Sequence, residues 1–523
     1  MSGLRSEVIP FRPEDKFALR SNMKKRLPLF LMIAALCALV SDSELATVEA
    51  QKAANAPDSA EQEARIARIE NGLLPAVVIK GQPAPTMTVA DRMKHYHVPG
   101  VSVAFFEQGQ IAWRRTYGFA DVAAKAPVTP ETLFQAASIS KPVSALAMLR
   151  LVQEGKLNLD EDVNSKLRAW KVPENEFTKE QRVTLRRIVS HSAGLTVHGF
   201  PGYASHEEVP TIIQILNGEK PANTAPIRVD TIPGTLWRYS GGGYVVMQLL
   251  LTEATGKPFP QILHDLVLQP VAMTHSTYEQ PLPKSLAGFA ATPYRSGGEP
   301  VKGGPHTYPE MAPAGLWTTP SDLARLAIEV QNEYAGKSSK ILSQEMMKQM
   351  LRRQKDDWGL GFGLQNSGSK LIFGHGGANE GYRCDLEAYA ESGQGLAIMT
   401  NSDSGGGLAT EYLRAVGKEY SWSDFQPTER TVGKADPALF PAYTGTYEIT
   451  GMGKLTISTK EGKLFILADP LGPDPQELLP ESHTQFFVLS GEVTFTFEKD
   501  EKGAVSKVRV KAGSQSFEAK KPP

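Results

Sequence analysis

The sequence predicts an α+β protein in which a region of mixed helices and strands is followed by a small all-β domain. Two observations support the mixed region: an apolar strand–turn–strand pattern over 101–117 and an almost wholly apolar helix over 141–154. A third is the change of pattern past Trp422, where short alternating runs between Gly- and Lys-rich turns are typical of half-buried strands. A chain of 523 residues suits two or three domains.

Composition excludes several functional classes. The chain has 56 basic and 57 acidic residues, so it carries no basic footprint for nucleic acid and no excess of positive charge for an acidic membrane surface. Its two cysteines, Cys37 and Cys384, allow one bridge at most, which excludes a disulfide scaffold. Cys384 is either a reactive thiol or, as is more usual, a packed small side chain. These properties indicate a globular enzyme.

The first fifty residues have the pattern of a secretory signal peptide. Three basic residues at 24–26 precede an apolar run over 27–40, and Ala50 supplies a small residue at the end. The run is shorter than the roughly 20 residues of a membrane span, so we expect none in the mature chain. A start at Met23 would remove the polar stretch before the signal. Cys37 follows a large residue where a lipoprotein signal has a small one, which argues against lipidation at this cysteine. We therefore expect a periplasmic or secreted protein.

The remaining elements follow in order along the chain. Residues 51–84 form a lead-in whose first part, 51–70, is a linker or a weak helix, and Gly155 ends the apolar helix. Apolar periodicity then predicts helices near 209–217, 241–256, 320–334 and 342–352, and strands near 371–374, 383–389 and 395–400.

The Ser138-Ile139-Ser140-Lys141 motif opens the apolar helix. Residues three apart on a helix lie on one face. A serine hydroxyl becomes a good nucleophile when a neighbour takes its proton, and a lysine can do so where burial favours its neutral form. Taken alone, the motif favours a helix cap followed by a surface lysine over a catalytic pair.

Two later motifs make a catalytic interpretation stronger. Tyr239 stands before a glycine run at 241–243 and an apolar helix, where its hydroxyl could relay protons. His375 is followed by Gly376 and Gly377 after a short strand, which leaves room for a substrate to pair with the strand edge. Singly, these are a core tyrosine at a helix entrance and a tight turn with an incidental histidine.

Together, in this order, the motifs resemble the serine β-lactamase and penicillin-recognising hydrolase superfamily over residues 85–420. The match is best to the branch of class C β-lactamases, D-Ala-D-Ala carboxypeptidases, D-aminopeptidases and esterases, whose later motifs are Tyr-x-Asn and His-x-Gly. Phrases at 132–134, 185–195 and 314–323 also resemble that branch. The resemblance implies an antiparallel sheet flanked by helices, an all-α lobe, and a site between them.

The resemblance also implies roles for individual residues. Ser138 is the acylated nucleophile, and Lys141 and Tyr239 share general-base and general-acid duties. The backbone N–H groups of Ser138 and Ala378 form the oxyanion hole, while His375 and Gly377 line the substrate cleft. The implied reaction is acyl transfer through an ester, followed by attack of water, with no cofactor and no metal.

One departure from the family pattern concerns Gly241, which stands where relatives have Asn. That Asn commonly holds the lysine and the carbonyl of amide substrates, so its loss weakens amide recognition unless another side chain replaces it. Ser240, Gln135 and Asn379 are the candidates. We therefore expect a peptidase or an esterase, acting on D-amino-acid peptides or carboxylic esters, rather than an efficient β-lactamase.

The C-terminal part, 432–523 after a linker over 421–431, resembles the lipocalin-like β-domain appended to such hydrolases, through residues 439–447 and 485–487. It either covers one side of the catalytic domain or gates substrate access.

The other histidines give weaker evidence of a functional role. His95 and His97 would share a face on a strand but have no third ligand at metal spacing, and His191 and His198 lie in a glycine-rich stretch, with His191 a hydrogen-bonded helix-end residue in the resembling family. The alternatives to a peptidase or esterase are a true β-lactamase and a non-hydrolytic sensor that binds penicillin or cell-wall fragments. The expected partner is a small molecule, peptide or ester, and the sequence predicts no oligomeric state.

Overall fold

The computed structural model describes residues 59–85, 87–449, 453–468, 471, 474–501, 503–512 and 515–521. The predicted signal peptide over 1–50, its start at Met23 and the Cys37 position lie outside the described residues. The chain divides into two compact units, Met1–Ala67 and Arg68–Pro523. Within the predicted lead-in, the described residues form a helix, α2 (Ser59–Glu70), and a strand, β1 (Val77–Ile79).

A seven-stranded antiparallel sheet forms the centre of the α+β domain, in the order β4-β3-β2-β10-β9-β8-β7. Its first hairpin, from the predicted strand–turn–strand, pairs through β2 with β10 from the far end of the domain. The strands are β2 (Gly100–Glu107), β3 (Gln110–Asp121), β4 (Ala126–Pro127), β7 (Gly363–Gln365), β8 (Ile372–Asn379), β9 (Tyr382–Tyr389) and β10 (Gly395–Thr400). The strand predicted at 371–374 is longer, because the glycine-rich segment after Phe373 continues to pair with β9.

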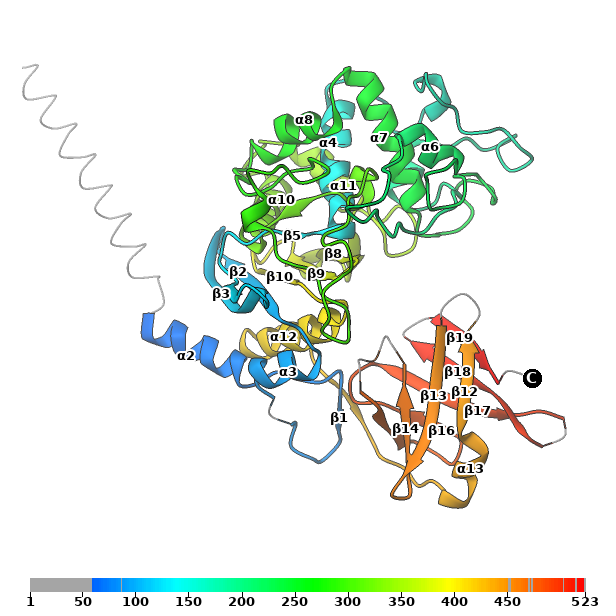
Figure 1. The fold of residues 1–523 in the computed structure, drawn as a ribbon. Coiled ribbons are helices and arrows are strands. Elements are labelled where there is room, and N and C mark those ends of the chain that lie inside the picture. Colours follow the sequence, from blue (N-terminus) through cyan, green and yellow to red (C-terminus); the bar gives the residue numbers. More distant parts are fainter. Residues whose placement is uncertain are drawn as a thin grey trace, which may run out of the picture. The chain divides into compact units, whose positions relative to one another are not determined.

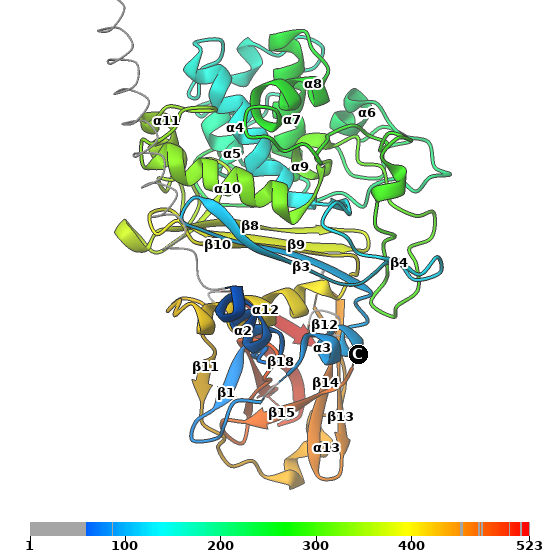
Figure 2. The ribbon, with the colours of Figure 1, turned by 90° about the vertical axis from the view of Figure 1, so that its left-hand side faces the viewer.

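Helices cover both faces of this sheet (Figures 1 and 2). One face carries α10, which packs on β10 and β2, together with the all-α lobe; the other face carries α12. The helices are α3 (Val89–His95), α4 (Ser140–Gln153), α5 (Leu185–Val189), α6 (Ile212–Asn217), α7 (Gly241–Thr255), α8 (Phe259–Leu263), α9 (Met311–Ala314), α10 (Pro320–Tyr334), α11 (Gln344–Met350) and α12 (Gly405–Glu419). Among the helices in the described ranges, none is long and apolar enough to cross a bilayer.

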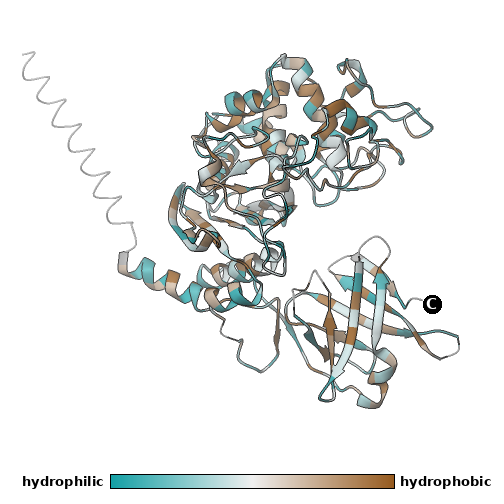
Figure 3. Ribbon diagram, viewed as in Figure 1, coloured by the Kyte–Doolittle hydropathy of each residue, from teal (hydrophilic) through white to brown (hydrophobic). Residues whose placement is uncertain are grey.

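One hydrophobic core joins the sheet to the all-α lobe. It contains Phe106 and Leu386 from the sheet, Leu146 from α4 and Leu250 from α7, all within 1% of complete burial. Figure 3 shows apolar colouring on α7, and eleven successive residues of this helix are buried. Burying both helices on all sides is what fixes their first turns, where the sequence motifs lie.

The C-terminal domain is a closed eight-stranded antiparallel barrel. Its strands are β12 (Gly445–Ile449), β13 (Gly453–Lys460), β14 (Lys463–Leu467), β15 (Gln476–Pro480), β16 (Gln485–Phe487), β17 (Val493–Lys499), β18 (Val505–Ala512) and β19 (Gln515–Lys520). The alternating residues Ile457, Phe495 and Val508 are buried in its core, which confirms the predicted all-β domain. The predicted linker over 421–431 holds a strand, β11 (Thr428–Arg430), which pairs in parallel with β1.

Candidate active site

Ser138 lies in a tight turn that leads into the buried helix α4. The turn is a 3-10 segment, Ala137–Ile139, and Ala137 adopts φ +50°, a left-handed conformation that costs a non-glycine residue about 1 kcal/mol or more. Lys141 Nζ lies 2.9 Å from Ser138 Oγ and donates to the Pro313 carbonyl at 3.0 Å. The first motif is therefore a hydrogen-bonded pair and not a cap with a surface lysine.

Burial controls the charge of Lys141. The side chain is 2% exposed, and burial lowers the pKa of its amine from 10.5 to about 7. Its surroundings are aromatic: Nζ lies 4.7 Å from the centroid of the Tyr239 ring and 5.9 Å from that of Tyr244. A substantial fraction of this amine is therefore neutral at pH 7 and able to accept a proton.

Tyr239 is brought to the same place from the residues just before α7. Burial raises the pKa of its hydroxyl well above the usual 10, and a hydrogen bond with Ser138 opposes this only in part. Its ring packs against His191, with centroids 4.2 Å apart, and against His198 at 4.8 Å. The phenol stays protonated at neutral pH, so it can give a proton rather than take one.

The edge of β8 runs past Ser138 and is open there. Strand β7 pairs only with Ile372, Phe373 and Gly374, so within the described strands the stretch from His375 to Asn379 has a neighbour on the β9 side alone. A Cβ atom on Gly377 would come within 2.3 Å of the Ala136 carbonyl oxygen. Glycine at this position lets the strand contact the turn that carries Ser138, and it leaves the next residue, Ala378, exposed on the open edge.

His375 is neutral and has one free nitrogen. Its Nδ1–H donates to the Gly376 carbonyl at 2.5 Å, which makes Nε2 the acceptor nitrogen of the ring. Burial, and to a lesser extent the nearby Lys141, lower the pKa of His375 to about 3. Nε2 is buried and has no hydrogen-bond partner among the described residues.

The position of Gly241 is filled by a neighbouring loop. A Cβ there would lie 2.9 Å from Phe200 Cε2 and 3.1 Å from the His198 carbonyl oxygen. Ser240 is one of three candidates to replace the missing Asn, but its hydroxyl is used elsewhere: it caps α7 by accepting from the Gly243 N–H and donates to the Thr196 carbonyl. The Pro313 carbonyl, which no sequence pattern indicated, holds Lys141.

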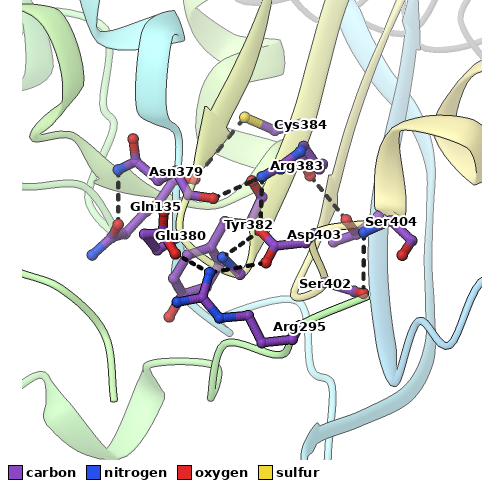
Figure 4. Close-up of polar contacts among 12 residues, drawn as sticks. Gln135, Arg295, Asn379, Glu380, Tyr382, Arg383, Cys384, Ser402, Asp403 and Ser404 are labelled. Carbon is purple, nitrogen blue, oxygen red and sulfur yellow. Dashed lines mark hydrogen bonds and ion pairs between the residues drawn. The ribbon is translucent and has the colours of Figure 1, made fainter. Parts of the chain in front are cut away.

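Gln135 and Asn379, the other two candidates, hydrogen-bond to each other (Figure 4). Asn379 Nδ2 donates to Gln135 Oε1 at 2.8 Å and to the Ala314 carbonyl at 3.1 Å, while Gln135 Nε2 donates to the His306 carbonyl at 2.7 Å. Arg383 donates to the Asn379 carbonyl. The pair ties the end of β8 to Ala314, the last residue of α9, and to His306, which precedes that helix. Ala314 follows Pro313, whose carbonyl holds Lys141.

The remaining candidates have packing contacts. His191 Nδ1 accepts from the Ser240 N–H at 3.1 Å, and Cys384 is a buried thiol, its pKa raised by burial, that donates to the Ala136 carbonyl at 3.1 Å. His95 ends α3 and His97 follows in a left-handed turn, so the strand face considered for them does not exist. In the part of the chain that the structure describes, no cluster of three or more His, Cys, Asp or Glu side chains is arranged for a metal.

Three residues near the site were not predicted from the sequence. The rings of Trp237 and Trp358 have centroids 5.5 Å apart, and Trp358 lies 5.4 Å from His375. Glu387, on β9, reaches the same region across Gly374. Trp237 is two residues from Tyr239 and could have been noticed; Trp358 and Glu387 arrive from distant segments and leave no local signal.

Two family profiles match the chain. The Beta-lactamase family profile matches residues 87–418, and a domain of unknown function (DUF3471) matches residues 429–521. Penicillin-binding protein 4* of Bacillus subtilis (strain 168) is 24% identical over 443 residues, which are 79% of this chain and 93% of that protein. Protein flp of Staphylococcus aureus (strain N315) is 29% identical over 231 residues, 43% of this chain and 42% of its own length.

Solved structures share the fold. The octameric penicillin-binding protein homologue from Pyrococcus abyssi aligns with a TM-score of 0.53 and 21% identity, over 82% of this chain and 98% of the other. SurE with D-Leu aligns with a TM-score of 0.50 and 20% identity, over 88% of this chain and all of the other. Since the family profile spans more than half of the 523 residues, the chain belongs to the β-lactamase family of serine hydrolases.

Proposed function

We propose that this hydrolase forms an ester on Ser138 and releases it to water, and that its substrates are carboxylic esters or D-amino-acid peptides. The observation that carries the proposal is the 2.9 Å contact between Ser138 Oγ and an amine whose pKa is about 7. We also propose a periplasmic or secreted location, from the signal-like N-terminal sequence, and a catalytic domain over 85–420 that the linker 421–431 joins to the domain at 432–523.

The mechanism follows from the protonation states. Neutral Lys141 takes the proton of Ser138 as Oγ bonds to the substrate carbonyl carbon, and the N–H groups of Ser138 and Ala378 stabilise the oxyanion. Protonated Tyr239 then gives its proton to the leaving group as that bond breaks, and it recovers a proton from Lys141. In the second half, water loses a proton to Lys141 and attacks the ester carbonyl. The bond to Ser138 Oγ then breaks and Lys141 returns the proton to that oxygen, which restores both residues.

The group that replaces the family Asn supports a preference for esters. A carbonyl oxygen can accept from Lys141 but cannot donate to a substrate. The Pro313 carbonyl therefore holds the amine without supplying the side-chain donor that amide substrates use. Losing such a hydrogen bond costs about 0.5–1.5 kcal/mol, and more if it strengthens in the transition state.

A substrate panel tests the proposal. We expect turnover of p-nitrophenyl butyrate to exceed turnover of nitrocefin, with a D-Ala-D-Ala peptide and D-Ala p-nitroanilide separating carboxypeptidase from aminopeptidase activity. The SurE structure was solved with D-Leu, which makes D-leucyl peptides a further useful member of the panel. Efficient nitrocefin hydrolysis would favour a β-lactamase, and an adduct that forms on Ser138 and never clears would favour a sensor.

The pH dependence of the reaction gives a second prediction. Only neutral Lys141 can act as the base, so kcat/KM for p-nitrophenyl butyrate should rise with pH, about tenfold per unit well below 7, and level off above about 7. His375, with its pKa near 3, contributes no change in this range. Initial rates from pH 5.5 to 9, corrected for spontaneous hydrolysis, provide the measurement. A profile that falls through pH 7 would show that a protonated amine is required.

A further inference from the structure

A pocket of about 480 Å³ opens beside His375, where β8 meets β7. His375, on its lining, lies three residues before Ala378 on β8, and the centroid of the Tyr239 ring lies 6.1 Å from that of His375. Its lining includes two aromatic rings, one imidazole and three carboxyl groups: Trp237, Trp358, His375, Asp356, Asp357 and Glu387. The mechanism proposed above does not use this space.

Apart from the imidazole, the ionisable groups that line the pocket are carboxyl groups. No lysine or arginine of the described chain lines it. Asp357 is paired with Arg353 at 3.0 Å, and both side chains lie at least partly in solvent. Glu387 differs, because its Oε2 atom is shielded from solvent and has no hydrogen-bond partner within the described ranges. A Cβ at Gly374 would lie 2.5 Å from that atom, so the missing side chain is what lets the carboxyl group lie against β8.

Other polar atoms of the lining have no hydrogen-bond partner among the described residues, and they indicate which ligand groups would suit the pocket. His375, 7% exposed, presents the acceptor Nε2, which needs a donor from a ligand. The faces of Trp237 and Trp358 favour a cation, since the aromatic quadrupole is negative over the ring. Their indole N–H groups have no acceptor among the residues whose positions are described. An occupant with an ammonium group and nearby carbonyl oxygens, as in an amino-acid or peptide unit, would satisfy all of these atoms.

We propose that this pocket binds a primary ammonium group on the leaving-group side of the substrate, with Glu387 and His375 Nε2 as its acceptors, and that it rejects a carboxylate. The leaving-group side is assigned because Tyr239, the proposed proton donor to the leaving group, lies beside His375, which lines the pocket. This inference rests on the proposed acyl transfer at Ser138. Such a pocket favours substrates whose leaving group carries an ammonium group over peptides that end in a free carboxylate beside the scissile bond.

The protonation of Glu387 adds a measurable signature. Burial, and then the neighbouring Asp385, raise the pKa of Glu387 well above its usual range, so its empty-site form is the neutral acid. Asp385 has a pKa raised by burial to about 6, His375 stays neutral, and Arg353 is already paired with Asp357. An ammonium ion favours the carboxylate, so its binding should release a proton and tighten as the pH rises.

Direct binding tests the pocket without catalysis. Calorimetry with 4-methylbenzylammonium, 4-methylbenzyl alcohol and 4-methylbenzoate compares three probes of similar shape and different charge. We expect the ammonium to bind about tenfold tighter than the alcohol, the benzoate not to bind, and Glu387→Gln to remove the ammonium preference. Glu461→Gln, in the exposed turn between β13 and β14, is the matched control and should keep the preference. Equal affinities for ammonium and alcohol, or a preference that survives Glu387→Gln, would overturn the inference.

Catalytic selectivity gives a second readout. Butyrate esters of 4-(aminomethyl)phenol, 4-methylphenol and 4-hydroxybenzoate differ in leaving-group acidity, but this difference cancels when the wild-type ratio of kcat/KM is divided by the variant ratio. We expect the cation-to-neutral ratio to fall about tenfold in Glu387→Gln and to fall also in Asp356→Asn, with melting curves confirming that both variants are folded. Fluorophosphonate labelling in parallel separates the two proposals. Labelled enzyme with an unchanged ratio refutes the pocket alone, and absent labelling refutes acyl transfer while calorimetry still decides the pocket.

Discussion

Replacing Ser138 by alanine is expected to abolish covalent labelling by a fluorophosphonate and to lower kcat for p-nitrophenyl butyrate by about 10³-fold or more. The variant keeps Lys141 and the backbone donors but has no oxygen to acylate. The turn should survive, because Ala137 and not Ser138 holds the left-handed conformation. Intact-mass spectrometry after labelling, together with initial rates, provides the measurement.

The matched control for this variant is Ser205→Ala, which changes an exposed serine in the same domain. It should be labelled and turn over substrate like the unaltered protein. A fluorophosphonate adduct that persists at full yield in Ser138→Ala would mean that another residue is the nucleophile, and the proposed mechanism would fall with it.

Replacing Lys141 by methionine is expected to lower kcat/KM by about 10³-fold and to remove the rise in activity around pH 7. Lys141→Arg should not restore the rate, since a guanidinium group stays protonated and cannot act as the base. Thermal stability should not fall along with the activity. Methionine has no charge to desolvate, so the Met variant should melt at no lower a temperature than the unaltered protein at pH 6, where the buried amine is mostly protonated.

Lys370→Met, which removes an exposed lysine, is the control for this second prediction. Its rate and pH profile should match those of the unaltered protein. If Lys141→Met retained more than about a tenth of the activity with the same pH profile, a different group would be the base, and the 2.9 Å contact with Ser138 would be structural.

The site was predictable from sequence to the extent that its chemistry lies in contiguous motifs. The Ser138 and Lys141 pair needs only a spacing of three residues. The 3-10 turn and the first turn of α4 supply this spacing, and the apolar residues of α4 hold the helix in the core. A serine before a helix can cap that helix or hydrogen-bond to a neighbouring group, and Ser240, one of the candidates for the Asn role, caps α7. Which carbonyl would meet Lys141 depended on the path of the chain around Pro313, which local pattern does not encode.

The fold shows the same division. Alternation at Leu455 and Ile457 indicates half-buried strands, but closure of the barrel requires β12 to pair with β19, and that pairing depends on the order of all the strands between them. The pocket beside His375 was beyond prediction for a similar reason. Trp358 comes from a loop and Glu387 from β9, and only the register of Gly374 against Glu387 brings that carboxyl group to the strand edge.

The open edge of β8 beside Ser138 also affects the release of product. Its main-chain groups bond to any extended backbone, whatever side chains that backbone carries. A product with an extended backbone therefore stays bound to this edge after the scissile bond is cleaved, and it competes with substrate for the site. The same property suggests a way to inhibit the enzyme. A short mimic of an extended backbone with an electrophilic end could bind this edge and react with Ser138 with little need for side-chain recognition.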